Sequence, residues 1–236
     1  MNNDPCYHRR TVRLKWLALA IPFSFLFFSC SPDPPEPTAA ASAPPVPVYE
    51  GTIVAVGNSL TAGLGVDEKM AYPDQLDRRL KADGYHFRVV NAGVSGETSS
   101  GALARIDWVI DSLQPDIVIL ETGANDGLRG IDPGLLEGNL NRLVERLTTQ
   151  NIQVILAGMQ MLPNLGPDYI RAFADIYPRI AAKHGVLLIP FFLEGVAGRH
   201  ELNQDDRLHP TAKGYARIVE TLYPAVVTAI QRHHLR

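Results

Sequence analysis

Residues 52–60 read TIVAVGNSL, a short apolar run that passes directly into a glycine and a serine. A run of this length, nearly continuous in apolar character, is typical of a strand that is buried on both faces of a parallel sheet. A serine two residues after a glycine at the end of such a strand lies on a tight turn, with its hydroxyl at the carboxyl edge of the sheet. We therefore predict a strand followed by a candidate nucleophile, Ser59.

The same pattern recurs along the chain, where short apolar runs alternate with longer amphipathic stretches. The predicted strands are Thr52–Val56, Phe87–Asn91, Asp116–Glu121, Gln153–Gly158 and Val186–Pro190. The predicted helices are Pro73–Ala82, Ser99–Leu113, Pro133–Thr149, Pro167–Lys183 and Thr211–Arg232, with His233 and His234 beyond the last one in a frayed tail.

This alternation predicts an α/β fold with three layers, α/β/α, around a doubly wound, five-stranded parallel sheet. In such sheets the ligand site lies outside the carboxyl ends of the strands, so the residues that follow each strand are the candidates for function.

The composition excludes several classes of protein. The chain has 236 residues, of which 46% are hydrophobic and 20% charged, which is typical of a globular protein with a substantial core. The net charge is -3 and no basic stripe is present, so nucleic acid is not an expected partner. The two cysteines, Cys6 and Cys30, provide neither a disulfide framework nor a thiolate zinc cluster.

Residues 1–29 have the character of an export signal. Basic residues lie at positions 9, 10, 13 and 15, and an apolar run follows at 16–28. This run has thirteen residues, whereas a membrane-spanning helix needs about twenty. Ser29-Cys30 resembles the lipobox of bacterial lipoproteins, which implies acylation of Cys30, although Phe27 and Phe28 depart from its usual pattern. Soluble secretion and an uncleaved anchor remain the alternatives, and Arg9-Arg10 weakly suggests a twin-arginine signal.

Residues 30–50 form a predicted tether. Positions 31–50 hold seven of the 18 prolines among Ala, Ser, Thr and acidic residues, a composition that forms neither a core nor a sheet. Extended as polyproline, this segment would span roughly 60 Å and hold a domain clear of a bilayer. The alternative is a disordered start without that role. We expect residues 51–236 to form the single folded domain, a monomer in the periplasm or cell envelope.

The turn Gly57-Asn58-Ser59-Leu60 allows two interpretations. Either Ser59 is a nucleophile, or Ser59 or Thr61 caps the next helix. The turn is not a phosphate loop, because no Gly-Lys-Ser/Thr follows. It is not a Gly-x-Ser-x-Gly elbow either, because Thr61 stands where the second glycine would be.

A nucleophilic serine needs a base, and the base needs a group that orients it. Among the seven histidines, His209 is the candidate, because it lies three residues after Asp206 and directly before the last helix. Asp206 can accept from the imidazole Nδ1–H and leave Nε2 to take the serine proton. By the chemistry of its side chain alone, Asp205 could orient the imidazole as well as Asp206.

Two further turns offer donors for an oxyanion. The turn 91–96 is rich in glycine, which permits close backbone approach, and the turn 121–126 carries the amide of Asn125. The N–H groups of Gly93 and Ser59 and the Asn125 amide are the candidate donors. Taken singly, each of these residues is also a common turn former.

Together these blocks resemble the SGNH, or GDSL, hydrolase family over about residues 51–229. The matching blocks are Gly57-Asn58-Ser59-Leu60, Gly93, Gly123-Ala124-Asn125-Asp126 and Asp206-Arg207-Leu208-His209. Residues 125–130, 161–164 and 189–192 are similar to the thioesterase I, lysophospholipase L1 and arylesterase branch. The resemblance implies a flavodoxin-like fold, Ser59 as nucleophile, His209 as base, Asp206 as its orienter, and an oxyanion hole of Ser59, Gly93 and Asn125.

The resemblance also implies a reaction without a metal or other cofactor, in which a carboxylic ester is hydrolysed through an acyl-enzyme. Asn58 departs from the aspartate of the family name, and we expect it to alter local pKa values without loss of activity. We expect aryl and short-to-medium acyl esters as substrates, with lysophospholipids and acyl thioesters as further candidates. Met161, Leu162 and Pro163 are expected to line the acyl site, whereas Met159 is expected in the core.

Two other functions remain open. One is O-deacetylation of a polysaccharide by the same fold, and the other is a lipoprotein that binds a ligand at this edge without catalysis. The joint presence of the five site residues favours catalysis, because a binding protein needs no such set. A flavodoxin-like cofactor protein is disfavoured, because no phosphate loop flanked by aromatic residues is present.

Overall fold

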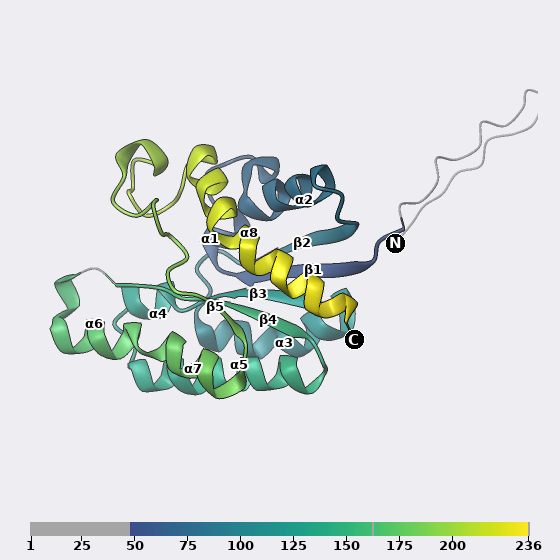
Figure 1. Cartoon of the computed structure of the whole chain (residues 1–236). Coiled ribbons are helices and arrows are strands. Elements are labelled where there is room, and N and C mark those ends of the chain that lie inside the picture. Colours follow the sequence, from purple (N-terminus) through teal and green to yellow (C-terminus); the bar gives the residue numbers. More distant parts are fainter. Residues whose placement is uncertain (1–47, 162, 236) are drawn as a thin grey trace, which may run out of the picture. The chain divides into compact units, whose positions relative to one another are not determined.

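The computed structural model describes residues 48–161 and 163–235. Its centre is a parallel sheet of five strands in the order β2-β1-β3-β4-β5 (Figure 1). The strands are β1 (Gly51–Gly57), β2 (Phe87–Gly93), β3 (Ile117–Glu121), β4 (Gln153–Ala157) and β5 (Leu187–Ile189). All five predicted strands are therefore present, and the predicted doubly wound sheet is confirmed.

Helices cover both faces of the sheet. Figure 1 shows α2 (Tyr72–Ala82) and α8 (Ala212–His234) on one face, and α3 (Ser99–Leu113), α5 (Pro133–Thr149) and α7 (Ile176–His184) on the other. The shorter helices are α1 (Ser59–Ala62), α4 (Ala124–Leu128) and α6 (Pro167–Ala174), and the 3₁₀ turns are η1 (Glu68–Met70), η2 (Pro163–Leu165) and η3 (His200–Leu202). This arrangement is the predicted three-layer α/β/α architecture.

The inner strands explain why the sequence shows apolar runs instead of alternation. Every residue of β3 and β4 is buried, because helices lie against both faces of these strands. On α5 the buried leucines recur at helical spacing, at positions 136, 140, 143 and 147, and point to the sheet.

Two predicted helix ends differ in the structure. The predicted helix Pro167–Lys183 is two helices, α6 and α7, which meet at Asp175. Pro178 has no N–H to donate to the carbonyl of Ala174, so the hydrogen-bond ladder is interrupted there. The frayed tail predicted after Arg232 is wrong, because α8 continues to His234 and the His233 ring packs edge-on against Phe87 at 5.6 Å.

The carboxyl ends of the strands and the loops that follow them lie at one end of the domain. In Figure 1 this is the left side, where α4, α6 and the long loop from β5 to α8 (olive) are found. The predicted signal peptide, Cys30 and the tether up to residue 47 lie outside the described residues. The tether's last residues, Val48–Glu50, are exposed and precede β1. In the described part of the chain, no helix has the length and apolarity to cross a membrane.

Candidate active site

Ser59 is the first residue of α1, directly after the turn that ends β1. Asn58, and neither Ser59 nor Thr61, caps the helix: its side-chain oxygen accepts the Leu60 N–H at 2.9 Å. Gly57 is required at the turn, because a Cβ there would lie 2.2 Å from the Thr61 hydroxyl. The Ser59 hydroxyl therefore does not cap the helix. Its contact within the turn is a long one, 3.5 Å to Asn58 Oδ1, and it can reach a second partner.

That partner is His209. Its Nε2 lies 2.8 Å from Ser59 Oγ, although 150 residues separate the two in the chain. Its Nδ1 lies 2.6 Å from Asp206 Oδ2, so Asp206 and not Asp205 contacts the ring. Asp206 Oδ1 also accepts the N–H groups of Leu208 and His209 at 2.9 and 3.0 Å. An array of hydroxyl, imidazole and carboxylate in this order can move a proton from the oxygen to the ring.

The charge on Asp206 is stabilised by these contacts. The backbone N–H and the imidazole of His209 lower the pKa of Asp206 to about 2. The carboxylate therefore stays ionised at neutral and mildly acidic pH. A charged acceptor at Nδ1 fixes the tautomer in which Nε2 is free to accept a proton.

The loop that carries His209 is fixed by backbone contacts at both sides. The His209 carbonyl accepts the Gln204 N–H at 2.7 Å, and Pro210 forms an isolated bridge with Asn203. The next residue, Thr211, caps α8 by accepting the Gly214 N–H at 3.3 Å. The imidazole is thus attached to the start of the longest helix in the described chain.

Ser59 and His209 line a pocket of about 450 Å³ at the carboxyl end of the sheet. Its polar wall also includes Asn58, Gly96 and Asn125. Its apolar wall includes Leu64, Leu128, Met159, Met161, Phe191 and Leu208. A pocket with one polar corner and several apolar side chains fits a small ligand that has both an apolar chain and a carbonyl group.

Two of the three predicted oxyanion donors meet at this pocket. The Ser59 N–H is at the first position of α1, where an N–H has no intrahelical partner. Asn125 lines the pocket, and one of its amide N–H groups is held by the Glu97 carbonyl at 2.9 Å. An amide carries two N–H donors, so the second is available.

The third predicted donor, Gly93, does not lie at this pocket. Its N–H donates to Asn91 Oδ1 at 2.9 Å, and a Cβ on it would meet the Ala62 backbone nitrogen at 2.2 Å. Its lack of a side chain therefore serves the close packing of β2 against α1. Gly96, the second glycine of the same loop, lines the pocket with a left-handed φ of +80°. The sequence analysis overlooked it, although the turn 91–96 contains both glycines.

An ion pair fixes the loop that presents Gly96. Both carboxylate oxygens of Glu97 accept from Arg105, at 2.6 and 2.7 Å, and Arg105 also donates to the Ala92 carbonyl at 2.8 Å. The Glu97 side chain is only 6% exposed. From the other side, Arg129 donates to the Gly96 carbonyl at 2.8 Å. Sequence reasoning gave no signal for this clamp, because no motif links Glu97 to Arg105.

A buried carboxyl group, Glu121, lies beneath the Ser59 turn. Its Oε1 accepts the Asn58 amide at 2.6 Å, and its Oε2 accepts the Thr61 hydroxyl at 2.9 Å and the Asn58 backbone N–H at 3.2 Å. Glu121 is fully buried, and burial raises its pKa to about 8 in spite of these donors. Asn58 thus connects the turn of the nucleophile to the end of β3.

Asp126, the neighbour of Asn125, faces away from the pocket. Its carboxylate accepts the backbone N–H and the hydroxyl of Ser99 at 2.8 and 2.5 Å, and Asn139 donates to the same hydroxyl at 2.9 Å. These contacts attach α4 to the beginning of α3 and to α5. Asp126 therefore anchors the helix that carries Asn125.

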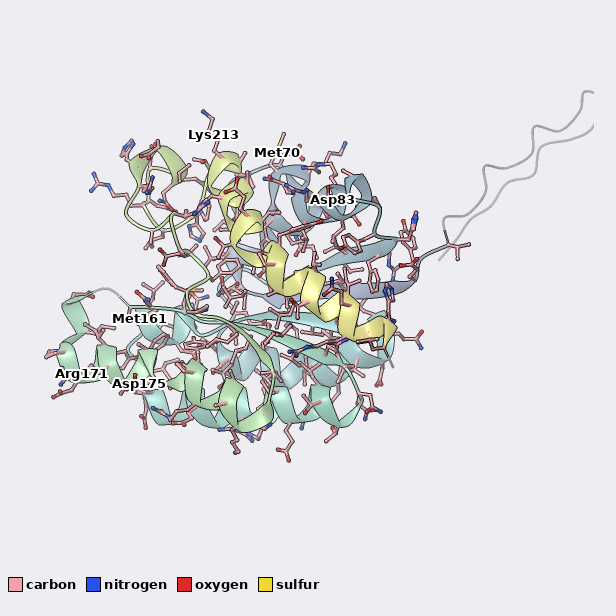
Figure 2. The ribbon with its side chains drawn as sticks, viewed as in Figure 1. Met70, Asp83, Met161, Arg171, Asp175 and Lys213 are labelled. Atoms are coloured by element: carbon pink, nitrogen blue, oxygen red, sulfur yellow. The ribbon has the colours of Figure 1, made fainter. Side chains whose placement is uncertain are left out.

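The predicted acyl-site residues are only partly described. Met161 lines the pocket, and Figure 2 shows it at the left side of the domain, between α4 and the loop that joins β5 to α8. Leu162 and the side chain of Pro163 lie outside the described part of the structure. Met159 is buried as predicted, with 2% exposure, but it also reaches the pocket wall. Within residues 48–161 and 163–235, no three His, Cys, Asp or Glu side chains gather as metal ligands would.

Known proteins share this sequence and architecture. Residues 55–217 match the model of the GDSL-like Lipase/Acylhydrolase family. Esterase TesA of Pseudomonas aeruginosa is 41% identical over 175 residues, which cover 74% of this chain and 87% of the relative. The arylesterase of Vibrio mimicus is 36% identical over 168 residues, 71% of this chain and 84% of the relative.

A solved structure that is similar to this chain is also that of an esterase. The psychrotrophic esterase EstA from a Pseudoalteromonas species superimposes with a TM-score of 0.74 at 32% identity, over 77% of this chain and all of that one. The family match spans β1 to α8 and so includes both the serine turn and the His209 loop. The chain accordingly belongs to the GDSL-like lipase/acylhydrolase family, and it is a carboxylic ester hydrolase.

Proposed function

We propose that the chain is a serine esterase in which Ser59, His209 and Asp206 act in sequence. His209 Nε2 accepts the Ser59 proton as the oxygen attacks the ester carbonyl, and a tetrahedral oxyanion forms. The proton then passes from His209 to the leaving alcohol, and the carbonyl carbon stays on Ser59 as an ester. Water, deprotonated by the same ring, attacks this acyl-enzyme and releases the acid.

The developing oxyanion is stabilised by three N–H donors. We assign the Ser59 N–H, the free Asn125 amide N–H and the Gly96 N–H to this role, with Gly96 in place of Gly93. All three residues line the same pocket as His209, whereas the Gly93 N–H is already bonded to Asn91. Donors fixed in advance by the protein are the largest single source of rate in acyl transfer.

The observation that carries this proposal is the 2.8 Å contact between His209 Nε2 and Ser59 Oγ. Its test is the hydrolysis of p-nitrophenyl butyrate by wild type and Ser59→Ala, together with labelling by a fluorophosphonate. We expect Ser59→Ala to lose labelling and nearly all activity. Equal labelling and equal activity of the two proteins would contradict the assignment.

The pocket supports esters with short-to-medium acyl chains. A volume of about 450 Å³ with Met161, Phe191 and Leu128 in its wall suits a flexible apolar chain of limited length. The test compares kcat/KM over acyl chains from acetyl to palmitoyl. We expect kcat/KM to be highest for acyl chains of intermediate length. Equal kcat/KM at all chain lengths would contradict the acyl-site proposal.

Export and lipid anchoring are proposals that rest on residues 1–50 alone. The basic region, the apolar run and Ser29-Cys30 support cleavage before Cys30 and acylation of that cysteine. The proline-rich tether then connects the lipid to the folded domain in the cell envelope.

A further inference from the structure

The segment that carries Ser59 and the loop that carries His209 come from distant parts of the chain. Residues 57–66 follow β1, whereas residues 190–211 join β5 to α8 and include only the short turn η3. A long connection of this kind has many accessible conformations, so contacts with its surroundings must fix the imidazole. Within the described residues, one hydrogen bond joins these two segments besides the contact between His209 and Ser59, and it is made by Gln204.

The side-chain amide of Gln204 donates to two carbonyl groups. Its Nε2 lies 2.8 Å from the Leu64 oxygen and 3.0 Å from the Pro210 oxygen. A carbonyl oxygen only accepts, so the nitrogen of the amide must face both groups. The amide lies close against Gly65, where a Cβ would meet Gln204 Oε1 at 2.1 Å. Gln204 therefore connects the end of the Ser59 segment to the residue that directly follows His209.

Backbone contacts close these bonds into a ring. The Leu64 N–H donates to the Ser59 carbonyl at 3.1 Å, and the Gln204 N–H donates to the His209 carbonyl at 2.7 Å. With the contact of 2.8 Å between His209 Nε2 and Ser59 Oγ, these four residues form a closed hydrogen-bonded ring, which we call the Gln204 ring. The distance between the base and the nucleophile is one side of this ring, so it depends on the other sides.

Gln204 can act on the reaction only through the segments that it joins. Its side chain is uncharged and does not line the active-site pocket, whereas Leu64 and His209 do. Asp206 contacts the imidazole from within the same loop and so orients it there. That contact does not determine where the loop lies relative to Ser59, and the bond from Gln204 to Leu64 supplies this second constraint.

We propose that Gln204 is a positioning residue that holds His209 Nε2 within hydrogen-bond reach of Ser59 Oγ. This inference rests on the proposed esterase function and adds a residue on which its geometry depends. The same imidazole deprotonates Ser59 and later the attacking water, so loss of the link slows both acylation and deacylation. A displacement of about 1 Å between reacting groups can lower a rate about 100-fold. Substrate binding depends on the pocket wall and changes less.

The test measures kcat and KM for p-nitrophenyl butyrate, the rate of labelling by a fluorophosphonate and the melting temperature of three variants. Gln204→Met keeps the approximate size of the side chain but has neither a donor nor a charge. Gln204→Asn keeps the amide on a side chain that is one methylene shorter, so it cannot reach both carbonyl groups. Gln204→Lys keeps N–H donors on a side chain that is long enough to reach them.

We expect kcat and the labelling rate to fall at least tenfold in Gln204→Met and Gln204→Asn, with KM within about threefold of wild type. Gln204→Lys should recover part of this loss. A side chain that only fills space would give the opposite order, with Gln204→Met closest to wild type. In Gln204→Met the acid limb of the pH profile of kcat/KM should stay in place, because the contact between Asp206 and His209 lies within the loop.

Gln75 is the matched control. It is partly buried like Gln204, and its amide also donates to two carbonyl groups of distant segments, to Met70 at 2.6 Å and to Ala212 at 3.0 Å. It does not belong to the Gln204 ring and does not line the active-site pocket. Gln75→Met should keep kcat within twofold of wild type, even where it lowers the melting temperature as much as Gln204→Met does.

The outcomes separate this role from the esterase function. A kcat within twofold of wild type in both Gln204→Met and Gln204→Asn overturns the role of Gln204 and leaves the esterase function intact. Equal losses of kcat in Gln204→Met and Gln75→Met, or a shifted acid limb in Gln204→Met, do the same. A wild-type protein that does not hydrolyse the ester contradicts the esterase function and this inference with it. If Gln204→Met does not fold, the comparison of Gln204→Asn with Gln204→Lys decides in the same way.

Discussion

Asp206 shows how one side chain prepares another for catalysis. It accepts two backbone N–H groups and the His209 ring, so its charge is stabilised before any substrate binds. Asp206→Asn keeps the size of the side chain, but the amide removes the charge and favours the wrong tautomer of the imidazole. We predict a fall in kcat of about 10³- to 10⁴-fold with little change in KM, measured with p-nitrophenyl butyrate.

Asp205 is the matched control for this variant. It is an exposed carboxylate next to Asp206 in the chain, and it makes no contact with the His209 ring. Asp205→Asn should keep kcat within twofold of wild type. Equal losses in the two variants would show that the charge of the loop, and not the contact with the ring, determines activity.

In Glu121, hydrogen bonding and burial shift the pKa of the carboxyl group in opposite directions. Three N–H and O–H donors favour its charged form, but complete burial favours the neutral form more strongly, and its pKa is raised to about 8. The pKa in the folded state therefore lies above that in the unfolded state. Such a group stabilises the fold fully below its unfolded pKa, and this contribution is lost as pH rises through the folded pKa.

The prediction for Glu121 concerns the pH dependence of stability. In wild type, Glu121 should lower the free energy of unfolding progressively from about pH 5 to pH 8. Glu121→Gln is isosteric and cannot ionise, so it should flatten that part of the profile, as measured by urea denaturation at several pH values. A profile with the same slope in both proteins would contradict the raised pKa.

Asn58→Asp tests the raised pKa of Glu121 by changing its hydrogen-bond partner. The new carboxyl group would lie within 2.6 Å of Glu121 Oε1, where Asn58 now donates its amide. Two carboxyl groups at this distance cannot both be ionised. We predict that Asn58→Asp retains esterase activity near neutral pH and loses more thermal stability than wild type as the pH is raised. A variant whose melting temperature parallels that of wild type at every pH would refute this.

At the scale of elements, the loop between β2 and α3 determines where Gly96 lies. Arg105 of α3 holds this loop through Glu97, and the Glu97 side chain is largely withdrawn from water. Arg105→Gln leaves that carboxylate unpaired and frees the loop. We predict a fall in kcat of about 10- to 100-fold with a smaller change in KM, because oxyanion donors act on the transition state.

An exposed ion pair between α5 and α3 provides the control. Arg146 of α5 contacts Asp107 of α3 at 2.7 Å, and both side chains are well exposed. Arg146→Gln should cost less than about 1 kcal/mol of stability and leave kcat unchanged. Circular dichroism should show that both variants are folded. If Arg105→Gln loses its fold without a specific loss of kcat, the clamp is structural only.

At the scale of the whole molecule, the order of elements followed from the sequence because burial leaves a clear pattern. Strands buried on both faces appear as continuous apolar runs, and α5 appears as leucines at helical spacing. The split of α6 from α7 was missed because the amphipathic pattern continues through Pro178. The end of α8 was missed because the packing of His233 on Phe87 joins residues far apart in the chain.

The site was predictable where a motif places chemistry next to a strand. Ser59, Asp206, His209 and Asn125 were found in this way, and the structure brings all four together. Gly93 and Gly96 could not be separated by sequence, because both lie in one glycine-rich turn. The structure separates them, since Gly96 lines the pocket and the Gly93 N–H donates to Asn91. Glu121 and Arg105 had no motif, since Glu121 bonds to Asn58 and Thr61, which lie 63 and 60 residues away in the chain, and Arg105 reaches Glu97 through the packing of the β2–α3 loop.

The N-terminal segment yields a prediction for the whole protein in a cell. If Cys30 is acylated, expression in a bacterium fed radiolabelled palmitate should give a labelled, membrane-associated protein. Cys30→Ser should abolish the label, whereas Cys6→Ser, within the predicted signal peptide, should not. Label that persists in Cys30→Ser would contradict the lipoprotein prediction.

The most direct measurement of the central claim is mass spectrometry of the protein after treatment with a fluorophosphonate, at neutral pH and with peptide mapping. The proximity of His209 to the Ser59 oxygen predicts one adduct per chain, on the peptide that contains Ser59, and a much slower reaction in His209→Ala. An adduct on another residue, or an unchanged rate in His209→Ala, would contradict the account.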